Sequence, residues 1–295
     1  MITGHRSVED TAGFGNAKWR ARPAVEVVAL TRNIMTSDRN IVVITGGASG
    51  IGASCAVTLA REGWQVVIAD RNVDDARKVA DAVGGHSVEL DVSDAAAVSR
   101  VADWVEQSVG PVLGLVNSAG ITQRPLPPHE FDMADWDAVH NIDFRGSYVS
   151  ALAFAKAMLA RRRGSIVNLS SIAGSRSMPL HAYAPAKAAV ISMTECLAAE
   201  WGPAGVRVNA VAPGYTLTPL LHEAIDRGER SVEGGLRNTP LGRMVLPEQV
   251  ADAVAFLLSS RAAAITGVNL PVDGGWLVGA TWDMYGGLRD QRPRI

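Results

Sequence analysis

A phenol and an amine with the spacing of one helical turn open an alanine-rich run of the chain. Tyr183 and Lys187 lie in the run Ala182–Trp201, whose composition predicts a helix. Side chains four residues apart share a helical face. A nearby ammonium favours the phenolate and lowers a tyrosine pKa that is about 10 in model peptides. Such a pair can take the proton of an alcohol, although most Tyr-x-x-x-Lys pairs are solvated helix faces.

Two serines precede this pair, where an apolar strand is expected to end. Ser170 and Ser171 follow the run Ser165–Leu169. Parallel α/β sheets hold their sites at the carboxyl ends of the strands. A hydroxyl group there can hold a substrate oxygen, and this context favours a catalytic interpretation of the tyrosine and lysine.

A glycine-rich turn, TGGASGIG, follows the apolar run Ile41–Thr45 and opens a predicted helix, Gly52–Arg61. Glycines let the backbone approach a pyrophosphate, whose charge is met by free N–H groups and the positive end of the helix. Glycine clusters also mark ordinary loops, so the turn needs support from its context. The turn residues that we expect to contact a dinucleotide are Gly46, Ser49, Gly50, Ile51 and Gly52.

An acid at the end of the next predicted strand supplies that context. Asp70 closes the run Gln65–Asp70 and lies 18 residues after Gly52, close to the spacing at which an acid meets the adenosine ribose. A carboxylate there accepts hydrogen bonds from the ribose hydroxyls and repels a 2′-phosphate. NAD is therefore the expected cofactor. Arg71 could instead bind that phosphate, which leaves NADP as the alternative.

From Asn40 onward, short apolar runs alternate with longer amphipathic ones. This pattern predicts an α/β fold, a Rossmann-type doubly wound sheet of seven parallel strands flanked by helices. The expected strands are Ile41–Thr45, Gln65–Asp70, Ser87–Leu90, Leu113–Asn117, Ser165–Leu169, Val206–Val211 and Asn269–Val272. The expected helices include Asp94–Ser108, Trp136–Arg163, Ala182–Trp201 and Pro247–Leu258.

The chain is expected to form one catalytic domain. Residues 39–295 are predicted to be a single dinucleotide-binding domain with a C-terminal tail, and residues 1–38 a poorly ordered leader, with Met35 as a possible start of translation. The stretch from Tyr215 to Met244 is long and polar, which suggests a lid over a site. The tail after the last strand is rich in aromatic residues, so we expect it to pack on another surface.

Composition excludes several classes of function. The net charge is −2 with both signs interspersed, which gives no basic face for nucleic acid. No apolar run is long enough to span a membrane. The two cysteines, Cys55 and Cys196, lack metal-ligand spacing, so no metal is expected, and their usage fits a reducing cytoplasm.

The motifs occur in an order that resembles the short-chain dehydrogenase/reductase family, and the resemblance covers Asn40 to Trp276. They are TGGASGIG, Asp70, LDVSD, NSAG, the serine pair, YAPAK, PGYTLT and ITGVNLPVDGG. The resemblance implies that Tyr183 is the general acid/base and that Lys187 binds the nicotinamide ribose. It implies further cofactor contacts at Asp91, Val92, Asn117, Ala119, Gly120, Pro213, Gly214, Thr216 and Thr218.

Two of the departures from the family pattern bear on the chemistry. Where the family usually has an asparagine whose main-chain carbonyl holds a relay water, this chain has Asp143. Because the carbonyl survives a change of side chain, we expect the relay to work and Asp143 to be a variation. The family spacing to the tyrosine selects Ser170 as the catalytic serine, whereas alignment on the strand selects Ser171. We choose Ser171, because loops vary in length more easily than packed strands.

These observations predict an NAD-dependent oxidoreductase that moves a hydride between the cofactor and a small polar secondary alcohol or its ketone, such as a polyol, sugar or hydroxy acid. An NADP-linked 3-oxoacyl thioester reductase and a non-catalytic cofactor-binding subunit are the alternatives. A homodimer or homotetramer is implied by the resemblance. The side chains expected around the substrate are Gln123, Arg124, Met178, His181, Leu217, His222, Arg237 and Trp276.

Overall fold

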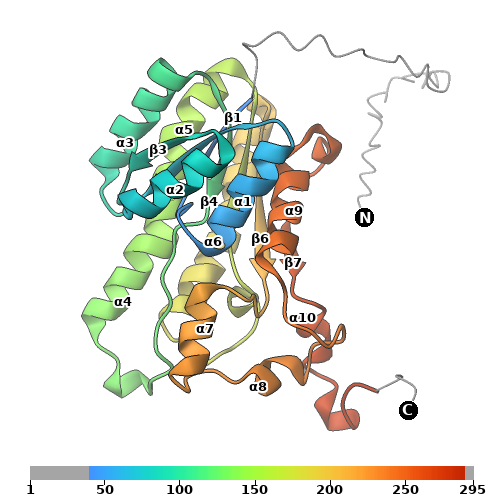
Figure 1. The fold of residues 1–295 in the computed structure, drawn as a ribbon. Coiled ribbons are helices and arrows are strands. Elements are labelled where there is room, and N and C mark those ends of the chain that lie inside the picture. Colours follow the sequence, from blue (N-terminus) through green and yellow to red (C-terminus); the bar gives the residue numbers. More distant parts are fainter. Residues whose placement is uncertain (1–39, 290–295) are drawn as a thin grey trace, which may run out of the picture. The chain divides into compact units, whose positions relative to one another are not determined.

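The computed structural model describes residues 40–289, and the predictions for the leader, residues 1–38, lie outside them. Seven parallel strands form one sheet in the order β3-β2-β1-β4-β5-β6-β7 (Figure 1). The Rossmann-type architecture predicted from the sequence is confirmed. The strands are β1 (Ile41–Thr45), β2 (Gln65–Asp70), β3 (His86–Glu89), β4 (Val112–Asn117), β5 (Gly164–Leu169), β6 (Val206–Pro213) and β7 (Asn269–Val272).

Helices cover both faces of the sheet. On one face, α1 (Gly50–Arg61), α2 (Val73–Val83) and α9 (Pro247–Leu258) pack against one set of strand side chains. On the other face lie α3 (Ala95–Trp104), α5 (Ser147–Arg161) and α6 (Tyr183–Trp201). Alternate residues of each strand supply the two faces, which is why the strands read as continuous apolar runs.

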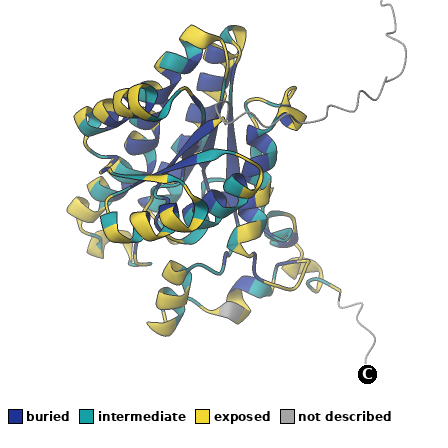
Figure 2. Ribbon diagram, turned by 45° about the horizontal axis from the view of Figure 1, so that its top comes forward, coloured by how far each residue is buried: buried dark blue, intermediate teal, exposed yellow. Residues whose placement is uncertain are grey.

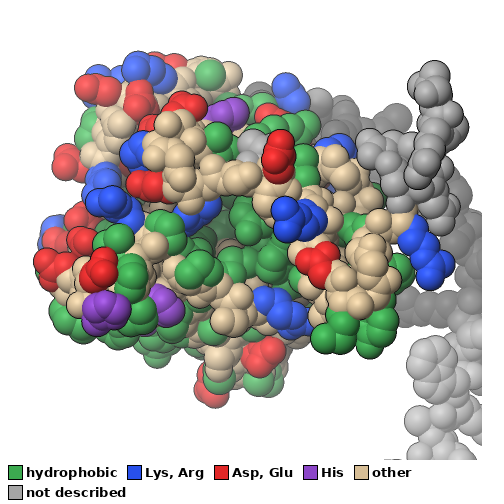
Figure 3. All heavy atoms as spheres, turned by 90° about the horizontal axis from the view of Figure 1, so that it is seen from below, with side chains coloured by type: hydrophobic (Ala, Val, Ile, Leu, Met, Phe, Trp, Pro, Cys, Tyr) green, Lys and Arg blue, Asp and Glu red, His purple; other side chains and the backbone are tan. Residues whose placement is uncertain are grey.

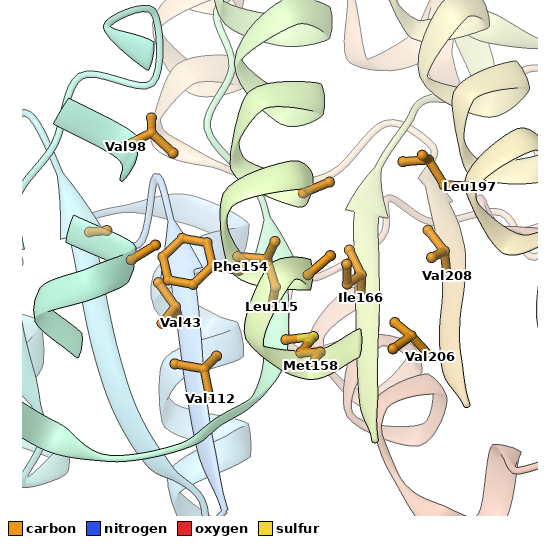
Figure 4. Packing of buried hydrophobic residues seen from close by; sticks show 14 of the residues in the cluster. Val43, Val98, Val112, Leu115, Phe154, Met158, Ile166, Leu197, Val206 and Val208 are labelled. Carbon is orange, nitrogen blue, oxygen red and sulfur yellow. The ribbon is translucent and has the colours of Figure 1, made fainter. Parts of the chain in front are cut away.

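The core therefore consists of two apolar layers separated by the sheet. Phe154 and Met158 of α5 pack on Leu115 and Ile166 of the central strands (Figure 4), and all four side chains are almost wholly buried. The five central strands are buried along most of their length, the edge strands β3 and β7 are partly exposed, and the helices expose their outer faces (Figure 2). This rigid centre fixes the positions of the strand ends.

The predicted helix Trp136–Arg163 is divided in the structure. It consists of α4 (Met133–Val139), a π-helical segment η3 (His140–Gly146) and then α5. The predicted helix Asp94–Ser108 likewise continues from α3 into a π-helical segment, η1 (Val105–Val109). A π-helical turn takes in an extra residue and often marks a functional site. Here η3 places Asp143 in its middle.

The lid segment predicted at residues 215–244 contains two short helices, α7 (Pro219–Asp226) and α8 (Val232–Leu236). After β7 the chain forms α10 (Trp276–Gly279), and Trp276 makes an edge-to-face contact with Tyr215 at 6.0 Å between ring centroids. The 3₁₀ turns are η2 (Pro128–Glu130), η4 (Ile172–Gly174), η5 (Gly202–Ala204), η6 (Ser260–Ala262) and η7 (Asp283–Tyr285). None of the described helices has the length and apolarity needed to cross a membrane.

Candidate active site

A cleft of about 560 Å³ opens at the carboxyl ends of the strands. Its walls come from the segments that follow β1, β2, β4, β5 and β6, and from α7. The strand order reverses between β1 and β4, and such a reversal leaves a crevice where α/β sheets bind ligands. The face seen from below in Figure 3 is hollowed near its centre, with hydrophobic side chains in the hollow and Lys and Arg side chains around it.

The glycine turn packs too closely for larger residues at two positions. Gly46 has a φ of +67°, and a Cβ there would lie 2.5 Å from the Cα of Ala119. A Cβ at Gly52 would lie 2.2 Å from the carbonyl oxygen of Gly46. Both distances are far below van der Waals contact, so the turn between β1 and α1 requires glycine and brings the segment after β4 against it.

The start of α1 fits a phosphate group. Ser49 is the N-cap residue, but its side chain accepts no hydrogen bond from the first turn. The first N–H groups of a helix have no partner inside the helix. Ser49, Gly50, Ile51 and Gly52 all line the cleft. The first turn therefore offers uncapped N–H donors and the positive helix end to the pyrophosphate of a dinucleotide.

Asp70, predicted to meet the adenosine ribose, lines the cleft and is held by two hydrogen bonds. Its Oδ2 accepts from the N–H of Ala48 at 3.0 Å, and its Oδ1 accepts from the N–H of Asn72 at 2.9 Å. Arg71 is exposed and lines the same part of the cleft. Farther along, Asp91 accepts from the N–H and hydroxyl of Ser93, and these hydrogen bonds lower the pKa of Asp91. Both acids are thus held in fixed positions on the wall of the cleft.

The first turn of α6 brings the phenol and the amine together in the cleft. The Nζ of Lys187 lies 5.4 Å from the centroid of the Tyr183 ring and donates to the carbonyl of Leu169 at 3.0 Å. The Oε1 of Gln123 accepts from the N–H groups of Ala182 and Tyr183 at 2.5 and 2.8 Å. This contact fixes the start of the helix, so Gln123 supports the site from behind.

The pKa of Tyr183 is raised, and the causes act in opposite directions. Burial raises the pKa, the Lys187 ammonium lowers it, the Asp143 carboxylate raises it, and hydrogen bonding to Ser171 lowers it. The spacing of tyrosine and lysine predicted a net lowering. Lysine acts in the predicted direction, but the burial of the phenol and a carboxylate from a distant part of the chain reverse the net shift.

The Asp143 carboxylate is completely buried and reaches the lysine. Its Oδ2 lies 3.0 Å from the Nζ of Lys187, and its Oδ1 accepts from the N–H of Ile121 at 2.8 Å. The main-chain carbonyl of Asp143, expected to hold a relay water, accepts from the hydroxyl of Ser147 at 2.9 Å. The expectation that this position is a variation without its own role does not account for these contacts.

The two candidate serines face different partners. The hydroxyl of Ser170 lies 3.0 Å from the carbonyl of Val211 and 2.6 Å from the Oδ1 of Asn269, so it ties β5 to β6 and β7. The hydroxyl of Ser171 accepts from the N–H of Ala173 at 3.1 Å and interacts with the Tyr183 phenol. Of these two serines, Ser171 is the one whose hydrogen bonding lowers the pKa of Tyr183.

All the residues proposed for the cofactor and for catalysis line the cleft except one. Asn117 is buried beneath it, where its Nδ2 donates to the carbonyl of Ser147 at 3.1 Å and to the Oδ1 of Asn168 at 2.9 Å. The last side chain of β4 points into the layer between sheet and α5. The Asn117 side chain, predicted to contact the cofactor, thus lies under the site and makes contacts with α5 and β5.

The substrate end of the cleft differs from the expectation. The side chains proposed for it from the sequence, from Gln123 to Trp276, do not line the cleft. Gln123 is buried behind α6, and His181 and His222 are exposed. The cleft is instead lined at this end by Ile121, Thr122, Tyr215, Leu220, Leu221, Ala224 and Arg230. No sequence motif marked Arg230 or the face of α7 that lines the cleft.

An ion pair joins the two walls of the substrate end. The Nε of Arg124, in the segment after β4, lies 3.6 Å from the Oε1 of Glu229, in the lid segment, and Arg227 lies 3.1 Å from the same oxygen. The Arg124 side chain is largely exposed. Within residues 40–289, no three His, Cys, Asp or Glu side chains are grouped so as to hold a metal ion.

This chain is similar to known proteins over most of its length. A family model described as "Enoyl-(Acyl carrier protein) reductase" matches residues 46–277. Galactitol 2-dehydrogenase of Rhizobium johnstonii is 39% identical, covering 81% of this chain and 95% of that protein. D-threitol dehydrogenase of Mycolicibacterium smegmatis is 38% identical, covering 82% and 94%. A solved structure named ribose-5-phosphate isomerase, from Brucella melitensis 16M, has a TM-score of 0.84 and 51% identity, covering 85% of this chain and 98% of that one.

Proposed function

The chain belongs to the short-chain dehydrogenase/reductase family and is an oxidoreductase acting on alcohols, and from this premise we propose that it interconverts a small polyol and its ketone with NAD. The observation that carries the proposal is the convergence of Ser171, Tyr183 and Lys187 in one cleft with a glycine turn suited to a pyrophosphate.

Each of the three side chains has a role that follows from its position. The nicotinamide, when bound, supplies the acceptor or donor of the hydride. In the oxidation, the alcohol carbon loses a hydride, the hydroxyl proton passes to the oxygen of Tyr183, and a C=O bond forms. Ser171 holds the substrate oxygen beside the phenol, and Lys187 orients the ribose and the phenol. In the reduction, Tyr183 returns the proton.

The preference for NAD rests on Asp70. Two main-chain N–H groups hold its carboxylate at the adenosine end of the cleft. A ribose with two free hydroxyls can donate to such a carboxylate, whereas a 2′-phosphate would face a fixed like charge. Arg71 beside it is the specific observation in favour of the alternative, an NADP-linked 3-oxoacyl thioester reductase.

The choice of a polyol rests on relatives and on the lining of the cleft. Two relatives bear the names of polyol dehydrogenases. Thr122, Tyr215 and Arg230 offer polar groups beside the apolar Ile121 and the leucines of α7. An aldose–ketose isomerisation, the activity for which the similar solved structure is named, involves no net redox change and so needs no nicotinamide cofactor.

The test is a screen of secondary alcohols, from tetritols to hexitols with hydroxy acids added, that follows NADH absorbance. We expect oxidation of at least one polyol with NAD, and a fall in kcat of roughly 10²–10⁴-fold in Tyr183→Phe, the range for a lost general base. NADH binding measured by fluorescence should persist in that variant. Full activity of Tyr183→Phe contradicts the mechanism, and thioester reduction with NADPH alone selects the alternative. Ribose 5-phosphate serves as a further substrate, followed by product analysis.

The proposal extends to assembly and location. Large apolar side chains of α5 and of the tail are exposed, among them Tyr148, Leu152, Val278 and Met284. Such surface is costly to leave in water, which supports a homodimer or homotetramer. Both cysteines are free thiols, as expected of an enzyme that works in the reducing cytoplasm.

A further inference from the structure

A buried ion pair stands directly behind the phenol of the active site. The carboxylate of Asp143 and the Nζ of Lys187 are 3.0 Å apart, and the exposed fractions of these side chains are 0% and 6%. The amine also donates to the carbonyl of Leu169. The other carboxylate oxygen accepts from the N–H of Ile121. One side chain of η3 therefore fixes both the lysine of α6 and the segment after β4.

The charge that the phenol meets follows from this pairing. The pair holds one proton, whether that proton lies on the amine or on the carboxylate, so its net charge is zero. A lysine without the acid would present a full positive charge 5.4 Å from the centre of the Tyr183 ring. A cation at that distance strongly stabilises a phenolate, and a neutral pair does so far less.

We propose that Asp143 is a positioning residue for the reaction, one that holds Lys187 in place and offsets its charge at the Tyr183 hydroxyl, so that the phenol keeps its proton to higher pH than it would beside an unpaired lysine. The inference rests on the proposed function, because it concerns the pH at which the phenol of that same site gives up its proton. It gives the acid at this position a task that an asparagine cannot perform.

Few other groups can produce the same effect. Among the described residues, the titratable groups facing the carboxylate are Lys187 and Tyr183 of α6 and His140 of η3. Burial lowers the pKa of His140, so this imidazole is neutral throughout the alkaline range. The segment after β4 contributes a main-chain amide, and the end of β5 contributes the Leu169 carbonyl and the Ser171 hydroxyl.

The shifts agree with the geometry. Burial raises the pKa of Asp143 against the lowering effects of Lys187 and of the Ile121 amide. Burial alone would lower the pKa of Lys187, but the neighbouring Asp143 and Tyr183 raise it, and the net shift is upward. Asp143 also acts on Tyr183 in the upward direction. Removing the acid's charge should therefore lower the pH at which the phenol titrates.

The first experiment uses the free protein and needs no substrate. The ultraviolet absorbance of phenolate is titrated in four proteins: the wild type, Tyr183→Phe, Asp143→Asn and the double variant. In each background, the absorbance curve of the protein with Tyr183→Phe is subtracted from that of the protein with Tyr183. The difference isolates Tyr183 from the other three tyrosines. We expect the midpoint in the Asp143→Asn background to lie about one pH unit lower, at the low end of the effect of an opposite charge nearby. An equal midpoint overturns the proposal.

The second experiment follows kcat/KM for alcohol oxidation against pH. The acidic limb should move downward by about one pH unit in Asp143→Asn, because the amide carries no negative charge to offset that of Lys187. Asp137→Asn is the matched control, since it removes an exposed acid from the same helical region. Its profile should coincide with that of the wild type. If Asp143→Asn lowers activity equally at every pH, Asp143 has a merely structural role.

The two proposals fail in different ways. A wild-type protein that oxidises no alcohol refutes the proposed function, and the phenolate titration still tests the role of Asp143. An active wild type with coincident pH profiles refutes the role of Asp143 and leaves the proposed function intact. Asp143→Ser is the second variant, should Asp143→Asn fail to fold.

Discussion

The two serines at the end of β5 differ in the groups that their hydroxyls face. The hydroxyl of Ser170 is buried among groups of β6 and β7, while that of Ser171 interacts with the phenol. We predict that Ser171→Ala lowers kcat/KM by roughly 10²-fold, as for loss of one aligned hydrogen bond to the reacting oxygen. Ser170→Ala should lower Tm by several degrees, because it removes a buried hydrogen bond between β5 and its neighbouring strands, and change kcat/KM less.

Steady-state kinetics and thermal melts of both variants decide this assignment. The reverse result, with activity lost in Ser170→Ala and kept in Ser171→Ala, would restore the family spacing as the better guide. Each variant is the control for the other, since both remove one hydroxyl from adjacent residues.

The second prediction at the residue scale concerns Asp70 and the choice of cofactor. Its fixed carboxylate faces the position of a 2′-phosphate, and Arg71 stands beside it. Asp70→Ala should lower the ratio of kcat/KM with NAD to that with NADP by at least about tenfold, which corresponds to about 1.4 kcal/mol. In Arg71→Ala, kcat/KM with NADP should fall below that of the wild type. A ratio unchanged by Asp70→Ala would remove the acid from cofactor selection.

At the scale of elements, the end of α5 carries strain that can be removed. Arg162 has a φ of +54°, the one positive φ among the described non-glycine residues. Its guanidinium donates to the carbonyl of Pro203 at 2.8 Å, an exposed contact that contributes little. Arg162→Gly should therefore stabilise the protein by about 0.5–1 kcal/mol, since glycine tolerates this conformation.

Arg163→Gly is the matched control for the end of α5. This neighbour is equally exposed and its φ is not positive, so glycine there should destabilise the protein slightly through backbone entropy. Chemical denaturation of both variants measures the difference. A lower free energy of unfolding for Arg162→Gly would show that the contact with Pro203 outweighs the backbone strain.

The elements of this fold could be predicted where a local sequence pattern determines the secondary structure. Buried parallel strands read as apolar runs, and Val206 to Pro213 extended only two residues past its expected end. The π-helical segments could not be predicted, because apolar periodicity does not distinguish an extra residue in one turn. The extra residue of η3 is held in place by contacts of Asp143 with α6 and the segment after β4.

The same distinction holds for the site. Tyr183, Lys187 and the glycine turn are local in sequence, and their chemistry could be inferred from type and spacing. Asn117 and Gln123 were assigned to ligands, yet both act through contacts with residues 30 or more positions away. Arg230 was not found at all, since only the packing of the lid segment brings it to the cleft.

At the scale of the whole molecule, the tail predicts an assembly. Met284 and Tyr285 are 88% and 85% exposed. We predict that a chain ending at Ala280 forms a smaller assembly than the full chain, seen as later elution in size-exclusion chromatography. A chain ending at Arg289, which keeps these side chains, is the control and should elute with the full assembly. An unchanged elution volume for the shorter chain would exclude the tail from subunit contacts.

The salt concentration of the medium acts on a surface ion pair beside the cleft. The pair of Arg124 and Glu229 joins the wall after β4 to the lid segment, and its arginine is bathed by solvent. Such an exposed pair contributes little to stability. Salt weakens it further, because the Debye length falls from about 10 Å at 0.1 M to about 3 Å at 1 M ionic strength. The lid predicted from the sequence would then be held closed in part by an ion pair that ordinary ionic strength weakens. Product release in this enzyme should quicken as the medium becomes more saline, while the buried proton-transfer groups feel no change.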